Sequence, residues 1–337
     1  MLNMDVYLSI CHYLDPIDIY HLSIMNTYFY DIINNNRQLW FNKINDYMIH
    51  NSINKSLHDK LMDYDISHYY MMIDYNKLSR NNSKSRKNIY SIPYFWNPCN
   101  ITRLYIQNNN ISSIMGWNPG NIDRLYINNN NISSIMGWNP GNINILYISN
   151  NKIESIVGWN PGNITRLFIQ NNNISSIVGW NPGNIILLSI TSNNIESIMG
   201  WNPGNITRLY ISGNNRISSI IGWDPCNINT LYIRHNNISS IIDWNPGNIT
   251  ELYIDNNNIS SIIGWDPGNI TELSISYNNI SSIIGWDPGN ITRFYIENNN
   301  ISSMMGFDPK NLQHIYLRGN PITYNDIPHN MHNIVHL

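Results

Sequence analysis

Charged residues are scarce in this sequence. Only 12% of its 337 residues are Asp, Glu, Lys or Arg, and the formal net charge is −3 at pH 7. Proteins that bind nucleic acid or anionic membranes through electrostatic attraction usually carry a basic surplus. We therefore expect no nucleic-acid partner and no membrane partner, while the low total charge still allows a local basic patch.

Cysteine is rarer still, with Cys11, Cys99 and Cys226 as the three residues of this type. Cys99 and Cys226 each replace the glycine of a recurring Asn-Pro-Gly-Asn turn, six copies of a repeat apart. At about 4.8 Å per copy they lie roughly 30 Å from each other, whereas a disulfide needs Cα atoms within about 7 Å. We expect free thiols and a reducing compartment.

Long apolar runs are missing as well. No stretch approaches the roughly 18 apolar residues of a membrane span. Met1–Asp5 lacks the basic start of a secretory signal, and no small-residue cleavage site follows it. We expect a cytoplasmic protein that is not secreted, in which sequons such as Asn163-Ile164-Thr165 stay unmodified.

Catalytic motifs are also absent. The sequence contains no G-x-S-x-G, no Walker loop, no C-x-x-C pair and no H-E-x-x-H. His329, His332 and His336 lie close together near the C-terminus, but no carboxylate or cysteine has a convincing spacing for a shared metal. We expect a binding protein that is not an enzyme and needs no cofactor or metal.

A repeat of 21 residues fills most of the chain. Its first copy, Ile101–Asn121, reads ITRLYIQNNNISSIMGWNPGN, and the pattern continues almost unchanged to Ile291–Asn311. The copy Ile206–Asn227 has one extra residue near Arg216, and a degenerate eleventh copy starts at Leu312. A fixed period in the twenties is typical of a solenoid, because no single copy can bury its own apolar face.

The apolar positions match the leucine-rich-repeat pattern, with Ile used freely for Leu. Leu104 and Ile106 alternate with Tyr105, as in a strand with one buried face. Asn109 follows where the chain turns, and its amide can donate to and accept from turn backbone groups of neighbouring copies. The equivalent column comprises Asn109, Asn130, Asn151, Asn172, Asn193, Asn214, Asn236, Asn257, Asn278, Asn299 and Asn320.

Stacked copies predict one long parallel β-sheet, on the order of 50 Å from end to end. Pro119 interrupts the far side of the copy, so we expect turns or 3₁₀ pieces there and a flatter arc than a helix-backed horseshoe. The predicted class is α + β. Its parts are a helical module at residues 2–45, a helical extension with a basic linker at 46–95, a solenoid of about eleven repeats at 96–328 and a C-terminal tail or cap at 329–337.

Residues 2–40 differ in kind from the repeats. Val6, Ile10 and Leu14 share one helix face, and Asp15 and Pro16 suit the N-cap and first position of a second helix. The order of landmarks resembles an F-box, a helical module that docks onto a Skp-type adaptor. These landmarks are Leu2, Asp5-Val6, Ile10, Tyr13-Leu14-Asp15-Pro16, Asp18, Leu22 and Leu39-Trp40, with Asn3 standing where the family usually has Pro.

The resemblance implies a role in ubiquitin ligation. It assigns adaptor binding to Leu2, Val6, Ile10, Leu14, Pro16, Leu22 and Trp40. The Asn and Ile bias suggests a very AT-rich genome. Overall the chain resembles the F-box and leucine-rich-repeat proteins of amoeba-infecting giant viruses. This implies a substrate receptor of a host cullin–RING ligase, monomeric outside that complex, in the host cytoplasm. The first alternative is a scaffold whose N-terminal helices only cap the solenoid. A surface receptor is the second, and the lone cysteines argue against it.

The outward face of the predicted sheet is the candidate target-binding surface. If Leu104 and Ile106 point inward, Arg103 and Tyr105 point onto the concave side. The candidate residues are Arg103, Tyr105, Arg124, Tyr126, Arg166, Phe168, Arg208, Tyr210, Tyr232, Arg234, Glu251, Tyr253, Asp255, Glu272 and Tyr295. The face is basic in its first half and acidic around Glu251, so a target protein with the opposite order of charge is expected. Alternatively, the tyrosines are inherited packing, with rings stacked along the sheet.

Overall fold

The computed structural model describes Ile92 and residues 101–337. The predicted F-box module at 2–45, with every candidate adaptor-binding residue from Leu2 to Trp40, lies outside the described residues. So does the predicted extension at 46–95, apart from Ile92, and so do Cys11 and Cys99. The expectations for these parts of the chain therefore stay predictions.

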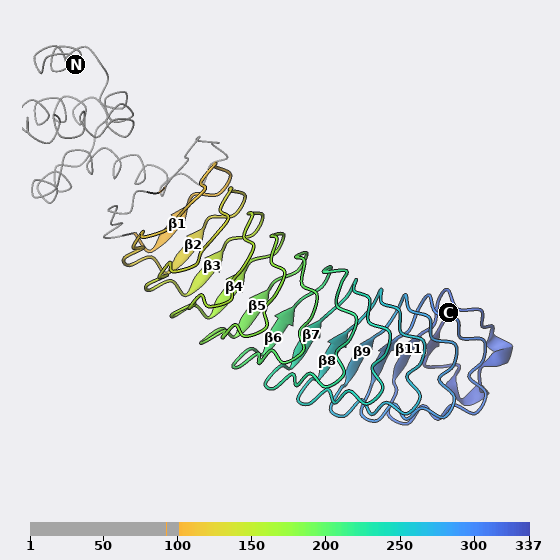
Figure 1. Ribbon diagram of the computed structural model, residues 1–337. Coiled ribbons are helices and arrows are strands. Elements are labelled where there is room, and N and C mark those ends of the chain that lie inside the picture. The colour runs from red at the N-terminus through yellow and green to blue at the C-terminus, as the bar shows by residue number, and fades with distance from the viewer. Residues whose placement is uncertain (1–91, 93–100) are drawn as a thin grey trace, which may run out of the picture. The chain divides into compact units, whose positions relative to one another are not determined.

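Residues 101–337 form one parallel sheet whose strands follow the order of the chain (Figure 1). The strands are β1 (Arg103–Tyr105), β2 (Arg124–Tyr126), β3 (Ile145–Tyr147), β4 (Arg166–Phe168), β5 (Leu187–Ser189), β6 (Arg208–Tyr210), β7 (Thr230–Tyr232), β8 (Glu251–Tyr253), β9 (Glu272–Ser274), β10 (Arg293–Tyr295), β11 (His314–Tyr316) and β12 (Val335–His336). From β1 to β11 the register places equivalent residues side by side, as in Tyr105 beside Tyr126. The predicted solenoid of 21-residue coils is confirmed.

Each strand is short because the chain turns directly after it. Leu104 and Ile106 are fully buried and Tyr105 between them is half-buried, which is the alternation expected of a sheet with one covered face. Asn108 then adopts a left-handed backbone with φ of 60°. Asparagine tolerates this region better than other residues with a side chain, so it ends the strand at little cost.

The core of each coil is a column of aliphatic side chains closed by a tryptophan. Ile111 and Ile114 are fully buried, and Trp117 is 1% exposed. The indole rings of Trp117 and Trp138 stack at 6.3 Å, and Trp138 Nε1 donates to the Trp117 carbonyl at 3.0 Å. The far side of the coils consists of turns, which confirms the expectation that α-helices are replaced there. Between residues 101 and 322 the described chain contains no helix.

The asparagine column ties neighbouring coils together. Asn193, which is 5% exposed, donates to the carbonyls of Ile190 at 3.0 Å and Ile169 at 3.3 Å. Its Oδ1 accepts the backbone N–H of Ile174 at 3.1 Å. The side chain thus satisfies backbone groups in its own coil and in the coil before it. Without it, the Ile190 carbonyl and the Ile174 N–H would be buried without partners, whereas the Ile169 carbonyl also accepts from Asn172 Nδ2.

The extra residue in the sixth coil breaks this column at one step. The sheet register continues from β6 to β7, and Trp201 still stacks on Trp223 at 6.5 Å. Asn236 Oδ1, however, is buried without a hydrogen-bond partner, although its equivalents accept the N–H of an isoleucine. The bulge around Arg216 displaces the isoleucine N–H that should fill this place.

Deleting Arg216 restores the 21-residue length of that coil, and we expect it to stabilise the protein. A regained buried hydrogen bond is worth about 1 to 2 kcal/mol, and the Arg216–Glu196 ion pair that is lost lies on the surface. Urea unfolding of the deletion variant measures this gain. Arg216→Ala keeps the bulge and is the matched control, expected to leave the urea midpoint nearly unchanged.

The C-terminal segment extends the sheet beyond the repeats. Two 3₁₀ helices, η1 (Tyr324–Asp326) and η2 (His329–Met331), lead into β12, which pairs in parallel with β11. The predicted tail at 329–337 therefore supplies a twelfth strand. The repeat pattern could not indicate this strand, because an open sheet edge pairs with any extended backbone whatever its side chains are.

Candidate functional site

The aromatic column of the concave face consists of the third residue of each strand from β1 to β11. Its members are Tyr105, Tyr126, Tyr147, Phe168, Ser189, Tyr210, Tyr232, Tyr253, Ser274, Tyr295 and Tyr316. Wherever two rings are neighbours, they stack with centroids 4.2 to 4.7 Å apart. The rings are half-buried, so their edges remain open to a partner. The same rings thus pack against one another and remain partly accessible to a partner.

The charge column consists of the first residue of each strand. Arg103, Arg166 and Arg208 are exposed, and Arg124 is half-buried beside Asp123, with Nε 3.3 Å from Oδ2. In the second half, Glu251 and Glu272 are half-buried. Along this column, the arginines of β1, β2, β4 and β6 thus precede the glutamates of β8 and β9, and exposed Arg293 follows on β10.

Arginines of the protein itself neutralise part of the negative charge in the second half of the concave face. Arg234 Nε lies 2.6 Å from Asp255 Oδ2 in an ion pair without a well-aligned hydrogen bond between these atoms. Asp255 is 6% exposed and also accepts from the hydroxyl of Ser274. Arg293 Nη1 donates to Glu272 Oε2 at 2.8 Å. Of the predicted target-binding residues, Asp255 is thus turned into the protein, while Glu251 and Glu272 keep some exposure.

Tyr253 belongs to the same network. Its hydroxyl donates to Glu272 Oε1 at 2.7 Å, and its ring lies under the guanidinium of Arg234, 4.9 Å from the ring centroid. Burial raises the pKa of Tyr253 far above its ordinary value, and the hydrogen bond to Glu272 raises it further. The phenol therefore remains a neutral donor over the whole physiological pH range.

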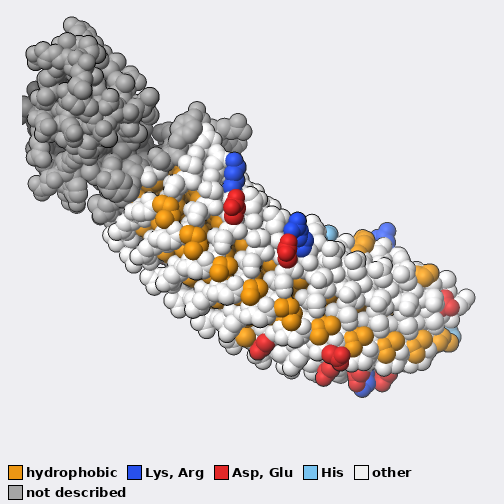
Figure 2. Space-filling view, in the orientation of Figure 1, with side chains coloured by type: hydrophobic (Ala, Val, Ile, Leu, Met, Phe, Trp, Pro, Cys, Tyr) orange, Lys and Arg blue, Asp and Glu red, His pale blue; other side chains and the backbone are white. Residues whose placement is uncertain are grey.

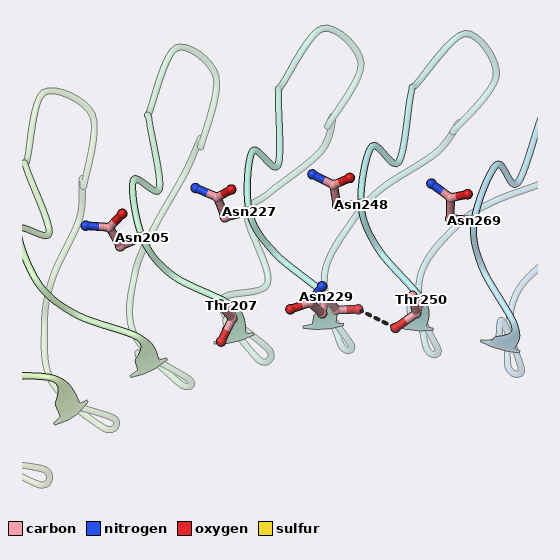
Figure 3. Close-up of a pocket in the computed structure, with 7 residues that line it drawn as sticks. All are labelled: Asn205, Thr207, Asn227, Asn229, Asn248, Thr250 and Asn269. Atoms are coloured by element: carbon pink, nitrogen blue, oxygen red, sulfur yellow. Dashed lines mark hydrogen bonds between the residues drawn. The ribbon is translucent and has the colours of Figure 1, made fainter.

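A polar groove at the start of strands β6 to β9 was not anticipated from the sequence. It is lined by Asn205, Thr207, Asn227, Asn229, Asn248, Thr250 and Asn269 (Figure 3). Asn248 Nδ2 donates to the Cys226 carbonyl at 2.9 Å, and Thr250 Oγ1 donates to the Asn229 carbonyl at 3.4 Å. These donors hold successive coils together, so the groove is a consequence of coil stacking.

A hydrophobic stripe runs along the far side of the coils, and Figure 2 shows it crossing one coil after another. It consists of the apolar residue before each Gly-Trp or Gly-Phe pair: Met115, Met136, Val157, Val178, Met199, Ile221, Ile263, Ile284 and Met305, each at least 36% exposed. Met115 Cε reaches over Gly137 of the next coil, within 3.5 Å of where a Cβ would stand. In every copy between Ile101 and Asn311, the residue two places before the Trp or Phe is apolar, which is the sequence signal for this stripe.

Metal ligands are not gathered in the described residues. The C-terminal histidines approach one another in pairs, with His314 Nδ1 3.2 Å from His336 Nε2 and the rings of His329 and His332 4.9 Å apart. No group of three or more His, Cys, Asp or Glu side chains within Ile92 and residues 101–337 is placed to share an ion. Cys226 is a free thiol in its turn, and burial raises its pKa.

Among the described residues, no helix has the length and apolar character needed to cross a membrane.

Comparison with known proteins identifies the fold. No family model matches the sequence, and no curated protein matches it. Among solved structures, the functional domain of InlJ from Listeria monocytogenes aligns with a TM-score of 0.51 and 20% identity, over 66% of this chain and 49% of that one. Internalin InlF from the same species aligns with a TM-score of 0.50 and 23% identity, over 67% and 76%.

A third match is an octameric complex of Latrophilin 3, Unc5D and the leucine-rich repeats of FLRT2, with a TM-score of 0.55, 19% identity and coverage of 70% and 80%. This chain spans about half the length of the InlJ chain that it matches. At such identities the likeness shows a leucine-rich-repeat solenoid and nothing about activity, because one fold serves many functions.

Proposed function

We propose that the chain is a substrate receptor of a cullin–RING ubiquitin ligase in the cytoplasm. Residues 2–45 dock the Skp-type adaptor, and the concave face of the solenoid holds a target protein. The chain itself catalyses nothing; it raises the concentration of the target near the ligase. The observation that carries target binding is the half-exposed aromatic column flanked by separate basic and acidic regions.

Several features support protein binding by this face. Stacked aromatic rings offer a large area and lose little conformational entropy on binding. Exposed Arg166 and Arg208 supply charge that steers a partner and sets its orientation. FLRT2, one of the structures with a similar fold, was solved in a complex with other proteins.

The adaptor half of the proposal rests on the order of residues at the N-terminus. The run Tyr13-Leu14-Asp15-Pro16 and the closing Leu39-Trp40 occur in the order of an F-box. The competing proposal is a repeat scaffold without a ubiquitin link. It is favoured by Asn3, which stands where the F-box family has proline.

A pull-down with the full-length chain tests the adaptor half. We expect the purified protein to retain a Skp-type adaptor at micromolar concentration. The double variant Leu14→Asp with Pro16→Ala should lose it, because both residues fall on the adaptor-facing positions of the F-box pattern. Tryptophan fluorescence checks that the solenoid of the variant is intact.

Tyr126→Ala is the matched control, since it alters only the concave face and should leave adaptor retention unchanged. Equal retention by the double variant, or no retention by the native chain, would contradict the ligase assignment. The scaffold alternative would then stand, with the N-terminal residues acting as a cap.

A further inference from the structure

The aromatic column has two interruptions, and they differ. Phe168 stacks on Tyr147 at 4.5 Å, and Tyr210 stacks on Tyr232 at 4.7 Å, but Ser189 stands between Phe168 and Tyr210. The second interruption is Ser274, between Tyr253 and Tyr295. A column that stacks wherever rings are adjacent therefore lacks one ring at each of these places.

The interruption at Ser274 is closed by the protein itself. Ser274 is 6% exposed, and its hydroxyl is bound to Asp255, which pairs with Arg234. Arg234 in turn covers Tyr253, whose hydroxyl is held by Glu272. A network of side chains from three neighbouring coils thus leaves Ser274 buried, with the Arg234 guanidinium over both Tyr232 and Tyr253.

The interruption at Ser189 has no such cover. Ser189 is half-buried, and the residues two places after Phe168, Ser189 and Tyr210 are the uncharged Gln170, Thr191 and Ser212. No ion pair reaches across this part of the described sheet. The register places Phe168 beside Ser189 and Ser189 beside Tyr210, so two strand spacings, roughly 9 to 10 Å, separate the two rings. One ring inserted midway would have the same spacing to each neighbour as the rings elsewhere in the column.

The side chains around the gap between Phe168 and Tyr210 determine which kind of ligand fits there. Leu187 precedes Ser189 by two residues and provides an apolar edge, and exposed Arg166 and Arg208 lie on the strands at either side of it. None of the ion pairs found among the described residues involves either arginine. Arg166 and Arg208 would repel a guanidinium that entered between the rings, whereas they would attract an aromatic ring with neighbouring carboxylates.

We propose that Ser189 marks an insertion slot between Phe168 and Tyr210 that receives one aromatic side chain from an acidic segment of the target protein, with Arg166 and Arg208 pairing its carboxylates. This inference rests on the proposed role of the concave face in holding a target. It adds the chemistry of the contact: one aromatic ring with acidic residues on both sides.

Calorimetric titration of the full-length chain tests the slot with a blocked peptide, Glu-Asp-Phe-Asp-Glu. We expect a dissociation constant of about 0.1 to 1 mM, with no binding by peptides that carry Ala for Phe or Lys for the acidic residues. Ser189→Tyr fills the slot and should weaken binding at least about tenfold, because the inserted ring loses both stacking partners. Ser189→Ala leaves the slot open and should bind within about twofold of the native chain.

Other results distinguish the insertion slot from a merely charged surface and from the ligase role. Native-like binding by Ser189→Tyr, together with loss in Arg166→Glu/Arg208→Glu, would overturn the slot while leaving the face as a charged docking surface. Absence of peptide binding at millimolar concentration would also overturn it. Adaptor retention does not involve Ser189, so failure of the pull-down with intact peptide binding would remove the ligase role and leave the slot in place.

Discussion

Replacing Asn193 with alanine is expected to lower the free energy of unfolding by about 2 to 6 kcal/mol. The change removes the acceptor of the Ile174 N–H and the donor to the carbonyls of Ile169 and Ile190. The Ile169 carbonyl still accepts from Asn172 Nδ2 at 3.0 Å. The Ile174 N–H and the Ile190 carbonyl are left buried without a partner, which costs about 1 to 3 kcal/mol for each group. Alanine is too short to replace any of the lost bonds.

Urea unfolding followed by tryptophan fluorescence measures this loss. Because each coil contacts only its neighbours, a weak step in the middle also uncouples the two halves, so the transition should broaden as its midpoint falls. Asn194→Ala changes an exposed neighbour and should stay within about 0.5 kcal/mol of the native protein. An equal effect at both positions would contradict the structural role of the asparagine column.

The bulge in the sixth coil offers a sharper comparison. Asn236 donates to the carbonyls of Ile233 at 3.2 Å and Arg234 at 3.1 Å, but its Oδ1 accepts nothing. Asn236→Ala therefore leaves no backbone N–H newly unpaired. It should cost clearly less than Asn193→Ala, although the two asparagines are equally buried.

Replacing Trp180 with alanine is the second change with a large expected effect, about 3 to 5 kcal/mol. The indole is 2% exposed and stacks 6.5 Å from both Trp159 and Trp201. Removing it opens a cavity between two rigid rings and leaves the Trp159 carbonyl without its donor. The coils cannot collapse into the space, because the strand pairing on the opposite side fixes their separation.

Trp180→Phe separates the two contributions. It retains an aromatic ring but not the N–H, so the loss should fall to about 1 to 3 kcal/mol. The chain itself tolerates this exchange at Phe307, the equivalent position near the C-terminal end, which is 5% exposed. Thermal unfolding of both variants measures the difference. A loss in Trp180→Phe as large as in Trp180→Ala would show that the hydrogen bond outweighs the packing.

The repeat made most of the fold predictable. Leu104, Ile106 and Tyr105 alternate over too few residues to identify a strand alone, but recurrence at every 21 residues turns a weak local signal into a sheet. The asparagine column and the turns on the far side followed in the same way. The N-terminal assignment has no such support, because residues 2–40 occur once.

The candidate site was predictable in composition but not in pairing. The sequence indicated that Arg234, Asp255 and Glu272 face outward with the tyrosines. It could not indicate that Asp255 turns to Arg234 and becomes buried, since this depends on side chains from different strands meeting at one register. It also gave no reason to treat the two serines of the aromatic column differently.

The sequence by itself determined the coil, because each residue of a repeat meets its own equivalent in the next copy, and one local pattern therefore specifies the stack. Tertiary structure alone decided what happens where copies differ. It left Asn236 Oδ1 unpaired beside the extra residue, buried Ser274 while Ser189 stayed half-buried, and recruited Val335–His336 as a last strand. Each of these outcomes depends on which side chains from neighbouring coils come into reach, a distance in space that no period in the sequence records.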